Sequence, residues 1–310
     1  MFASVWKLLS FAIGAASLRR QTLQPVHLAV QPNCGSLSGP PADVNGGLQP
    51  LGSYKSIVSF GDSYTSGGTI NGSKLPPPIL SPPNPNAGGR ISNGPLWIEN
   101  LASSAGAELH DWAANGSVVD SSIYLNRTFD APDFMTQVNN YIDTRLASAE
   151  TLYVIFMGIG DYELRNEVQT VSLILASDII WAMLELSSSP IFGTDFLVVD
   201  NYGRGTQSAV GDAYKTSLFS QLNSLNGMGL NIGFVDFKTL WDGVLHSNPG
   251  YQAFGYISAG SCLLSDLTMS QACNDPDHTF YWIPGHPSAA THTIMADYVK
   301  EVLTQCTARK

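Results

Sequence analysis

Short apolar segments alternate with longer amphipathic segments over most of this chain. The short segments are rich in β-branched and aromatic residues and end at Gly, Asp or Asn, as buried parallel strands do; they cover residues 55–60, 107–114, 151–158, 194–201 and 231–237. Apolar residues recur at helical spacing between them, which predicts helices over residues 94–106, 132–150, 168–186 and 211–227. This alternation predicts an α/β fold, namely a three-layer α/β/α sandwich with a central parallel sheet of about five strands.

The chain ends in one more amphipathic pattern, over residues 286–306, whose apolar face we expect to pack on the sheet. That face consists of Ile294, Met295, Tyr298, Val299, Val302 and Leu303. The segment 168–186 is apolar enough to resemble a membrane span, but Asp178 and Glu185 interrupt it, which favours a core helix. No repeat or change of composition appears, so we expect one domain over residues 51–310, preceded by an extension over residues 18–50.

The first 17 residues have the layout of a secretory signal peptide. One Lys precedes an apolar run of about ten residues, which is too short for a membrane span, and small residues follow at Ala15 and Ser17. The alternatives are an ordinary N-terminal helix or a transit peptide, because Arg19 and Arg20 follow and no acidic residue precedes Asp43. We expect secretion to the cell exterior after removal of residues 1–17, with the cleavage point left open and no stable membrane insertion.

Charge and cysteine content narrow the class of protein further. The net charge of -10 and the 15 Lys and Arg residues among 310 argue against a nucleic-acid partner, which requires clustered cations. The even number of cysteines without a Cys-x-x-Cys pair favours disulfides over zinc. Three pairings are open: Cys262 with Cys273 would close a short loop and Cys34 with Cys306 would join the two ends, and free buried thiols are the other alternative.

Glycosylation sequons begin at Asn71, Asn115 and Asn126, and we expect Asn71 and Asn126 to be glycan acceptors in surface loops. The sequence leaves the oligomeric state open.

The first predicted strand stops at Gly61-Asp62-Ser63. By itself this tripeptide is equally suited to ending a strand and capping a helix. In open α/β sheets, however, ligands bind beyond the carboxyl ends of the strands, which places Ser63 in the expected active crevice. A serine oxygen needs a base to take its proton, and His286, directly before the final helix, is the candidate.

The chain resembles the GDSL or SGNH hydrolases, and among them the secreted fungal acetylesterases, similar to carbohydrate esterase family 16. The resemblance covers about residues 54–304. It rests on four blocks in the family's order, "FGDSYTSGG" (followed by "GGRISNGPLWIENLA"), "WAANGSVVD", "FMGIGDYE" and "GHPSAATH". It implies a flavodoxin-like three-layer fold, acyl transfer to water, no metal or organic cofactor, and a small ester or acetylated carbohydrate as substrate.

The resemblance also implies the roles of individual residues. Ser63 is expected to be the nucleophile, and His286 the general base and then the general acid. The backbone N–H groups of Ser63 and Gly116 are expected to hold the oxyanion. Asn115 would then lie beside the pocket, which makes it a poor glycan acceptor.

This sequence departs from the family pattern in the third block. Gly160 stands where the family usually has an Asn whose side chain donates to the oxyanion. The backbone N–H of Gly160, or the side-chain amide of Asn93 or Asn115, is the expected substitute.

A second departure is in the last block, where Ile283 stands three residues before His286 in place of the usual Asp. A backbone carbonyl near Trp282 or Ile283 is then expected to orient the imidazole, leaving a Ser-His dyad. The alternative is a displaced acid, for which Asp275 and Asp277 are the candidates. Elsewhere, we expect His292 on the surface of the final helix.

Two classes of function remain open. The first is a secreted esterase for acetyl or other short acyl groups, with a lipase for longer chains as its variant. The second is a catalytically weakened member of the family that binds carbohydrate or has a structural role. We expect the Pro-rich segment 75–89 and the loop 245–281 to shape the substrate cleft.

Overall fold

The computed structural model describes residues 24–146, 150–164, 169–200, 202, 204–205 and 207–307. The predicted signal peptide, residues 1–17, lies outside the described residues, as does the first part of the predicted extension 18–50.

A six-stranded sheet forms the centre of the molecule, in the order β1-β6-β5-β4-β2-β3. Its strands are β1 (Val44–Gly46), β2 (Ser56–Gly61), β3 (Glu108–Asp111), β4 (Thr151–Phe156), β5 (Asp195–Asp200) and β6 (Asn231–Asp236). The five strands β2 to β6 are parallel, as predicted, and follow the flavodoxin-like order, whereas β1 pairs antiparallel with β6. The sequence did not predict β1, which lies inside the segment assigned to the extension.

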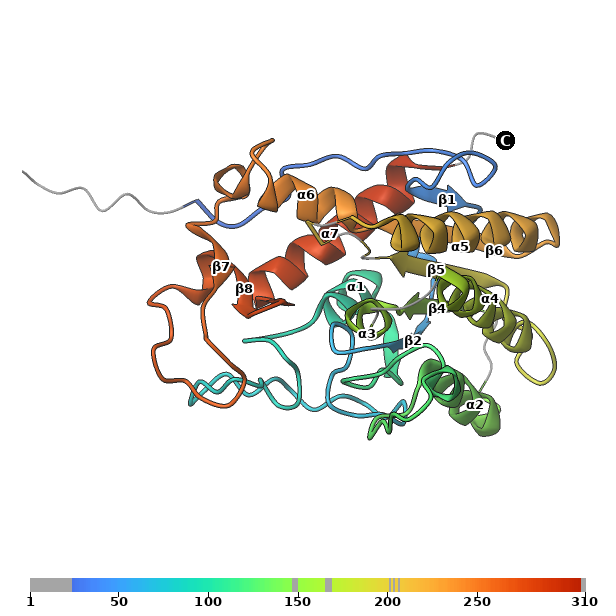
Figure 1. Ribbon diagram of the computed structural model, residues 1–310, viewed down its shortest axis with the longest axis horizontal. Helices are drawn as coiled ribbons and strands as arrows, with labels where there is room; N and C mark the ends of the chain where they lie inside the picture. Colours follow the sequence, from blue (N-terminus) through green and yellow to red (C-terminus); the bar gives the residue numbers. More distant parts are fainter. Residues whose placement is uncertain are drawn as a thin grey trace, which may run out of the picture.

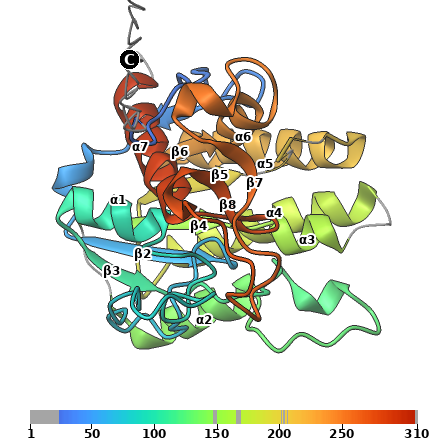
Figure 2. The same cartoon turned by 90° about the vertical axis from the view of Figure 1, so that its left-hand side faces the viewer.

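Helices cover both faces of this sheet. They are α1 (Trp97–Ala105), α2 (Phe134–Thr144), α3 (Ile159–Glu163), α4 (Gln169–Leu186), α5 (Ala209–Gly227), α6 (Lys238–Leu245) and α7 (Ala289–Gln305). Helices α1, α6 and α7 contribute to one buried apolar cluster, and α2, α4 and α5 contribute to the other. Figures 1 and 2 show α1 and α2 on opposite sides of β2. The predicted three-layer α/β/α sandwich is therefore confirmed.

The apolar stripe predicted on the final helix is buried in α7, where it packs against α1 and the sheet. One predicted helix and one predicted strand end earlier in the structure than the sequence indicated. The helix predicted over 132–150 ends at Thr144, because Arg145 adopts the left-handed conformation at φ 55°. The strand predicted over 107–114 ends at Asp111, whose carboxylate accepts the N–H of Ala113. Within the described ranges, no helix combines the length and apolarity that a membrane crossing requires.

A second, three-stranded sheet lies next to α7 and consists of β7 (Ser258–Ser261), β8 (Thr279–Ile283) and β9 (His286–Pro287). Both disulfides named from the sequence are present. Cys34 is bonded to Cys306 just after α7, and Cys262 to Cys273 across the loop between β7 and β8. The second bridge therefore closes a loop of the small sheet that carries His286.

Candidate active site

The nucleophile block forms a tight turn at the carboxyl end of β2. The β2 residues from Ile57 onward are buried, which explains the apolar run, and the strand ends at Gly61. The carbonyl of Asp62 then accepts the N–H groups of Thr65 and Ser66, at 3.1 and 2.9 Å. This turn places Ser63 beyond the strand end and beside β4, at the point where the strand order reverses.

Ser63 and His286 form a hydrogen-bonded pair, with 3.0 Å between Ser63 Oγ and His286 Nε2. His286 begins β9, which pairs antiparallel with β8 through a two-residue turn of Pro284 and Gly285. Helix α7 follows directly, with the side chain of Ser288 as its N-cap. The imidazole is therefore held between a hairpin turn and a helix start.

The environment keeps the His286 imidazole neutral near neutral pH. Burial lowers the pKa of His286 below its usual value, the carbonyl of Pro284 opposes this shift, and the nearby charge of Arg204 adds to it. A neutral imidazole with Nε2 facing a hydroxyl is the state that a general base requires.

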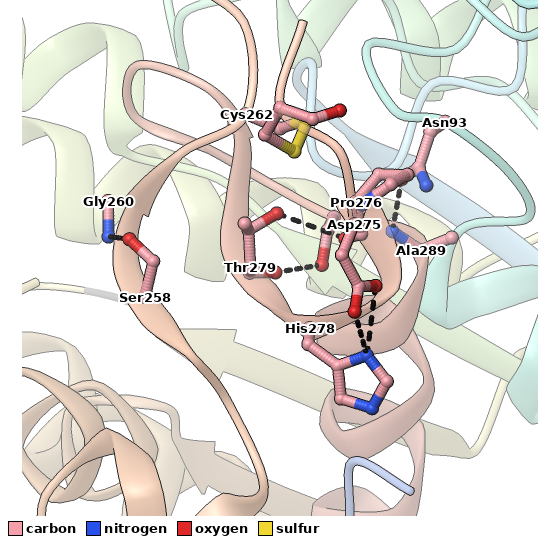
Figure 3. The surroundings of a disulfide bond; sticks show 11 residues. Asn93, Ser258, Gly260, Cys262, Asp275, Pro276, His278, Thr279 and Ala289 are labelled. Carbon is pink, nitrogen blue, oxygen red and sulfur yellow. Dashed lines mark hydrogen bonds and ion pairs between the residues drawn. A yellow bond between two sulfur atoms is a disulfide. The ribbon is translucent and has the colours of Figure 1, made fainter. Parts of the chain in front are cut away.

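No carboxylate among the described residues hydrogen-bonds to His286. The imidazole Nδ1 instead faces the carbonyl oxygen of Pro284 at 3.4 Å. A backbone carbonyl thus takes this place, as predicted, although it belongs to Pro284 and not to Trp282 or Ile283. The Asp275 carboxylate instead binds the Nδ1 atom of His278, at 2.9 Å (Figure 3).

Gly160 of the third block lies against Ser117, the residue that follows Gly116 in the second block. Gly116, in the loop after β3, has φ 86°, a conformation that favours glycine. Gly160 is the second residue of α3, so its N–H is one of the donors without an intrahelical partner. A Cβ added at Gly160 would lie 2.8 Å from the carbonyl oxygen of Ser117. A side chain at position 160, such as the Asn of the family pattern, would therefore displace the backbone of Ser117.

The two amides considered as substitute donors lie in different surroundings. The Asn93 side-chain oxygen accepts the N–H of Ala289 at the start of α7, at 2.8 Å (Figure 3). Asn115 is exposed in the loop before Gly116. The proximity of both amides to the oxyanion position stays a prediction.

Two buried polar side chains that sequence reasoning missed hold these loops together. Gln137 of α2 bonds both the N–H and the C=O of Gly61 at 3.0 Å, and its Nε2 donates to Ser117 Oγ at 2.8 Å. Asp161 of α3 accepts the N–H of Val119 at 3.1 Å. The carboxyl end of β2, the second block and the third block are thereby tied to one another. Neither side chain has a sequence signal beyond its position in an amphipathic helix or a family block.

Two further side chains near the dyad were also missed, Tyr64 and Arg204. Tyr64 is fully buried, its ring packs 5.7 Å from the His286 ring, and its hydroxyl donates to the carbonyl of Gly285. Arg204 Nη1 donates to the Tyr64 hydroxyl at 3.2 Å. The block "FGDSYTSGG" includes Tyr64, but no motif singled out Arg204.

The prediction for His292 was wrong: its side chain is fully buried. The residue lies on the face of α7 that packs against α1, and its Nδ1 accepts the N–H of Trp97 at 3.2 Å. Burial lowers the pKa of His292 to about 3, so the imidazole stays neutral. The helical period alone did not show that α1 covers this face.

The Pro-rich segment 75–89 is attached to the elements around the site. Arg90 is fully buried, binds both carboxylate oxygens of Glu99 at 2.7 Å, and donates to carbonyls at Pro76 and Ala87. The indole of Trp282 in β8 donates to the carbonyl of Pro85 at 2.7 Å.

A small apolar cluster joins these elements to the loop that the Cys262–Cys273 bridge closes. The buried members of the cluster are Ile91, Cys262, Leu263, Trp282 and Ile283. The disulfide loop therefore lies beside the hairpin that presents His286. Among the residues that the structure describes, no group of three or more His, Cys, Asp or Glu side chains is placed to hold a metal ion.

Comparisons with known proteins assign the chain to a family. Residues 57–299 match the family model of the GDSL-like lipases/acylhydrolases. The match covers most of the chain, and the protein belongs to this family. An acetylesterase from Hypocrea jecorina is 25% identical over 175 residues, an alignment that covers 49% of each chain. The chain thus aligns with about half the length of this relative.

Two solved structures show weaker similarity. A family two carbohydrate esterase from Clostridium thermocellum, in complex with cellohexaose, is 15% identical with a TM-score of 0.46, over 82% of this chain and 64% of that one. A member of the lipolytic protein G-D-S-L family from Veillonella parvula is 15% identical with a TM-score of 0.44, over 81% of this chain and 98% of that one. At these scores neither structure bears on the substrate of this protein.

Proposed function

We propose that this protein is a carboxylic ester hydrolase in which Ser63 is the nucleophile and His286 its base. The observation that carries the proposal is the 3.0 Å hydrogen bond between Ser63 Oγ and His286 Nε2 at the carboxyl end of a parallel sheet. In the reaction, Ser63 Oγ attacks the ester carbonyl while its proton passes to His286 Nε2. His286 then protonates the leaving alcohol, which leaves the acyl group on Ser63 Oγ. Water next attacks the acyl carbonyl while its proton passes to His286 Nε2, and that proton returns to Ser63 Oγ as the carboxylic acid leaves.

The proposed oxyanion donors are the backbone N–H groups of Ser63, Gly116 and Gly160. Support comes from the contact between the Gly160 and Ser117 backbones and from the position of Gly160 in the first turn of α3. Backbone donors of this kind are preorganised and need no side-chain ordering. The usual Asn donor is thus replaced by main-chain groups alone.

The proposed substrates are acetyl or other short acyl esters of carbohydrates. The similarity to an acetylesterase supports the acyl group, and the aromatic and Pro-rich segments joined at Trp282 support a shaped cleft beside the dyad. The test is hydrolysis of p-nitrophenyl acetate, butyrate and decanoate and of an acetylated oligosaccharide, with Ser63→Ala as the control. Rates that fall from acetate to decanoate support the proposal, and faster turnover of decanoate indicates a lipase.

A second candidate function rests on the two departures, Gly160 and Ile283. A protein that lacks both a side-chain oxyanion donor and a triad acid is a candidate carbohydrate-binding member of the family without turnover. Binding of the acetylated oligosaccharide by wild type and by Ser63→Ala, with no hydrolysis of any ester by wild type, would favour this candidate over the esterase.

Secretion is also part of the proposal. The two disulfides support it, as do the exposed positions of Asn71 and Asn126 in their sequons. Intact mass spectrometry of the protein collected outside expressing cells is expected to show loss of about 17 to 25 residues and no alkylatable thiol. A retained Met1 with four reactive cysteines would contradict it.

A further inference from the structure

His286 lacks the carboxylate that orients the imidazole in a serine triad, yet it points at Ser63. Among the described residues, its Nδ1 has the Pro284 carbonyl as its only hydrogen-bond partner, and the 3.4 Å distance is longer than usual for such a bond. The position of the imidazole therefore depends on how firmly the turn of Pro284 and Gly285 is held.

Tyr64 holds that turn. Its hydroxyl donates to the Gly285 carbonyl, and burial raises the pKa of Tyr64, so the phenol keeps its proton and remains a donor. The ring is itself immobilised, with Phe156 at 5.7 Å and Trp241 at 6.1 Å between ring centroids. Because Tyr64 follows the nucleophile directly, one residue links the Ser63 turn to the His286 turn.

Arg204 completes the connection. Its Nη1 donates to the Tyr64 hydroxyl at 3.2 Å, so the hydroxyl acts as acceptor and donor at once. Its Nη2 binds Glu163 of α3 at 2.7 Å. The guanidinium thus links Tyr64 to helix α3. This is the helix whose second residue is the proposed oxyanion donor Gly160.

We infer that Tyr64, held by Arg204, is the positioning residue for His286 and takes over the orienting task of the missing triad acid through the backbone of Gly285. The inference rests on the proposed Ser63–His286 dyad. Tyr64 touches neither reacting atom, so its effect is on the geometry of the base. The assembly also differs from a triad in the sign of its charge: a triad acid favours the imidazolium, whereas the Arg204 cation disfavours it.

Several charged and titratable groups surround His286, and their charges determine how its pKa should shift in each variant. Arg204 lowers the pKa of His286, whereas Glu163 and Asp266 raise it. The neighbouring His292 stays neutral, and Tyr64 stays protonated. Replacing Arg204 by a neutral residue therefore shifts the pKa of His286 upward, opposite to the shift that follows loss of a triad acid.

The central experiment compares Tyr64→Phe with Tyr54→Phe. Tyr54 is a matched control: it is buried in the same apolar cluster, and its hydroxyl likewise has two partners, the N–H of Gln49 at 2.9 Å and Asp195 at 3.0 Å. We expect Tyr64→Phe to lower kcat on p-nitrophenyl acetate about 10- to 100-fold with KM changed less than about threefold, because a displacement of about 1 Å costs on that order. Tyr54→Phe is expected to lower the melting temperature similarly and leave kcat within twofold.

The second experiment uses Arg204→Gln, which alters a partly exposed side chain and leaves the core intact. Its kcat is expected to fall, and the acid limb of its kcat/KM profile to move to higher pH. Glu163→Gln is expected to move that limb to lower pH. Any of three results would overturn the inference. They are a kcat of Tyr64→Phe within twofold of wild type, an equal loss of kcat in Tyr54→Phe, or an acid limb of the kcat/KM profile that does not move in Arg204→Gln. Wild-type protein without Ser63-dependent hydrolysis would instead overturn the proposed function.

Discussion

Ser63 Oγ and His286 Nε2 lie 3.0 Å apart, although 223 positions separate the two residues in the chain. Ser63 follows the end of strand β2, and His286 lies in the β8–β9 hairpin directly before helix α7. The pair has hydrogen-bond geometry suited to proton transfer without a third side chain. The turnover and pH dependence of such a pair, which has no triad acid in the described part of the chain, can be tested with the following variants.

Removal of either member of the pair is expected to abolish hydrolysis. Ser63→Ala and His286→Ala should each lower kcat about 1000-fold or more, and the double variant should be little worse, because the two act as a unit. The measurement is turnover of p-nitrophenyl acetate by purified variants. His278→Ala, which removes a histidine bound to Asp275, is the control and should remain within twofold of wild type. Retention of a tenth of the activity by Ser63→Ala would mean that the Gly-Asp-Ser motif only forms the turn that ends β2.

The rate should depend on pH through His286. Burial first, and the charge of Arg204 with it, lowers the pKa of His286 below the usual 6.5. A general base works when deprotonated, so kcat/KM rises as pH passes upward through this pKa, and the midpoint of the acid limb lies below pH 6.5. The profile is measured on the acetate ester over the range in which circular dichroism shows a constant fold. A midpoint above pH 6.5 would contradict the proposed environment of His286.

The loop acids are expected to contribute little to catalysis. Asp275 is engaged with His278, and neither Asp275 nor Asp277 bonds to His286 among the described residues. Asp275→Ala and Asp277→Ala should therefore each lower kcat less than about tenfold, far below the ~10,000-fold loss seen when a true triad acid is replaced. A loss of about 1000-fold in Asp277→Ala would identify a displaced triad acid.

Restoring the acid should increase the rate at some cost in stability. The β8–β9 register pairs Ile283 with His286, and directly opposed residues of an antiparallel pair present their side chains on the same face. Ile283→Asp should raise kcat about tenfold and move the acid limb to higher pH, since a neighbouring carboxylate favours the imidazolium. The unfolding free energy should fall by about 1–3 kcal/mol, because Ile283 is buried in an apolar cluster.

Ile283→Asn is the control for this change, since it loses the same packing and adds no charge. Its acid limb should not move upward. Identical pH profiles for the Asp and Asn variants would show that a side chain at position 283 does not reach the imidazole.

Gly160 is expected to tolerate no side chain. A Cβ at this position would lie 2.8 Å from the Ser117 carbonyl oxygen, so Gly160→Ala should displace the Gly116 loop and lower kcat about tenfold or more. Gly160→Asn carries the same Cβ and should not increase activity, although it adds the side-chain amide of the family pattern. Gly227→Ala, at a helical position where a Cβ meets nothing within 4 Å, is the matched control. A Gly160→Asn variant more active than wild type would contradict the steric argument.

Much of the architecture followed from local patterns in the sequence. The five parallel strands and the main helices were predicted because each has its own apolar period, which burial against one layer imposes residue by residue. The buried stripe of α7, from Ile294 to Leu303, is an example. The element ends were less accurate, because the stop at Thr144 depends on one left-handed residue that no period encodes. The edge strand β1 was missed, since three residues carry too little pattern.

The candidate dyad was also predictable, because the order of the family blocks names Ser63 and His286 and the α/β alternation places Ser63 at the end of a strand. Only the tertiary structure decided what stands around them. The Pro284 carbonyl at Nδ1, the contact of Gly160 with Ser117 and the burial of His292 all depend on which surfaces face each other after the layers pack. The links from Arg204 to Tyr64 and from Tyr64 to Gly285 span 140 and 221 positions. Contacts of this range leave no periodic trace in a single sequence, because each depends on distances that exist only once the sheet, its helices and the hairpin have assembled.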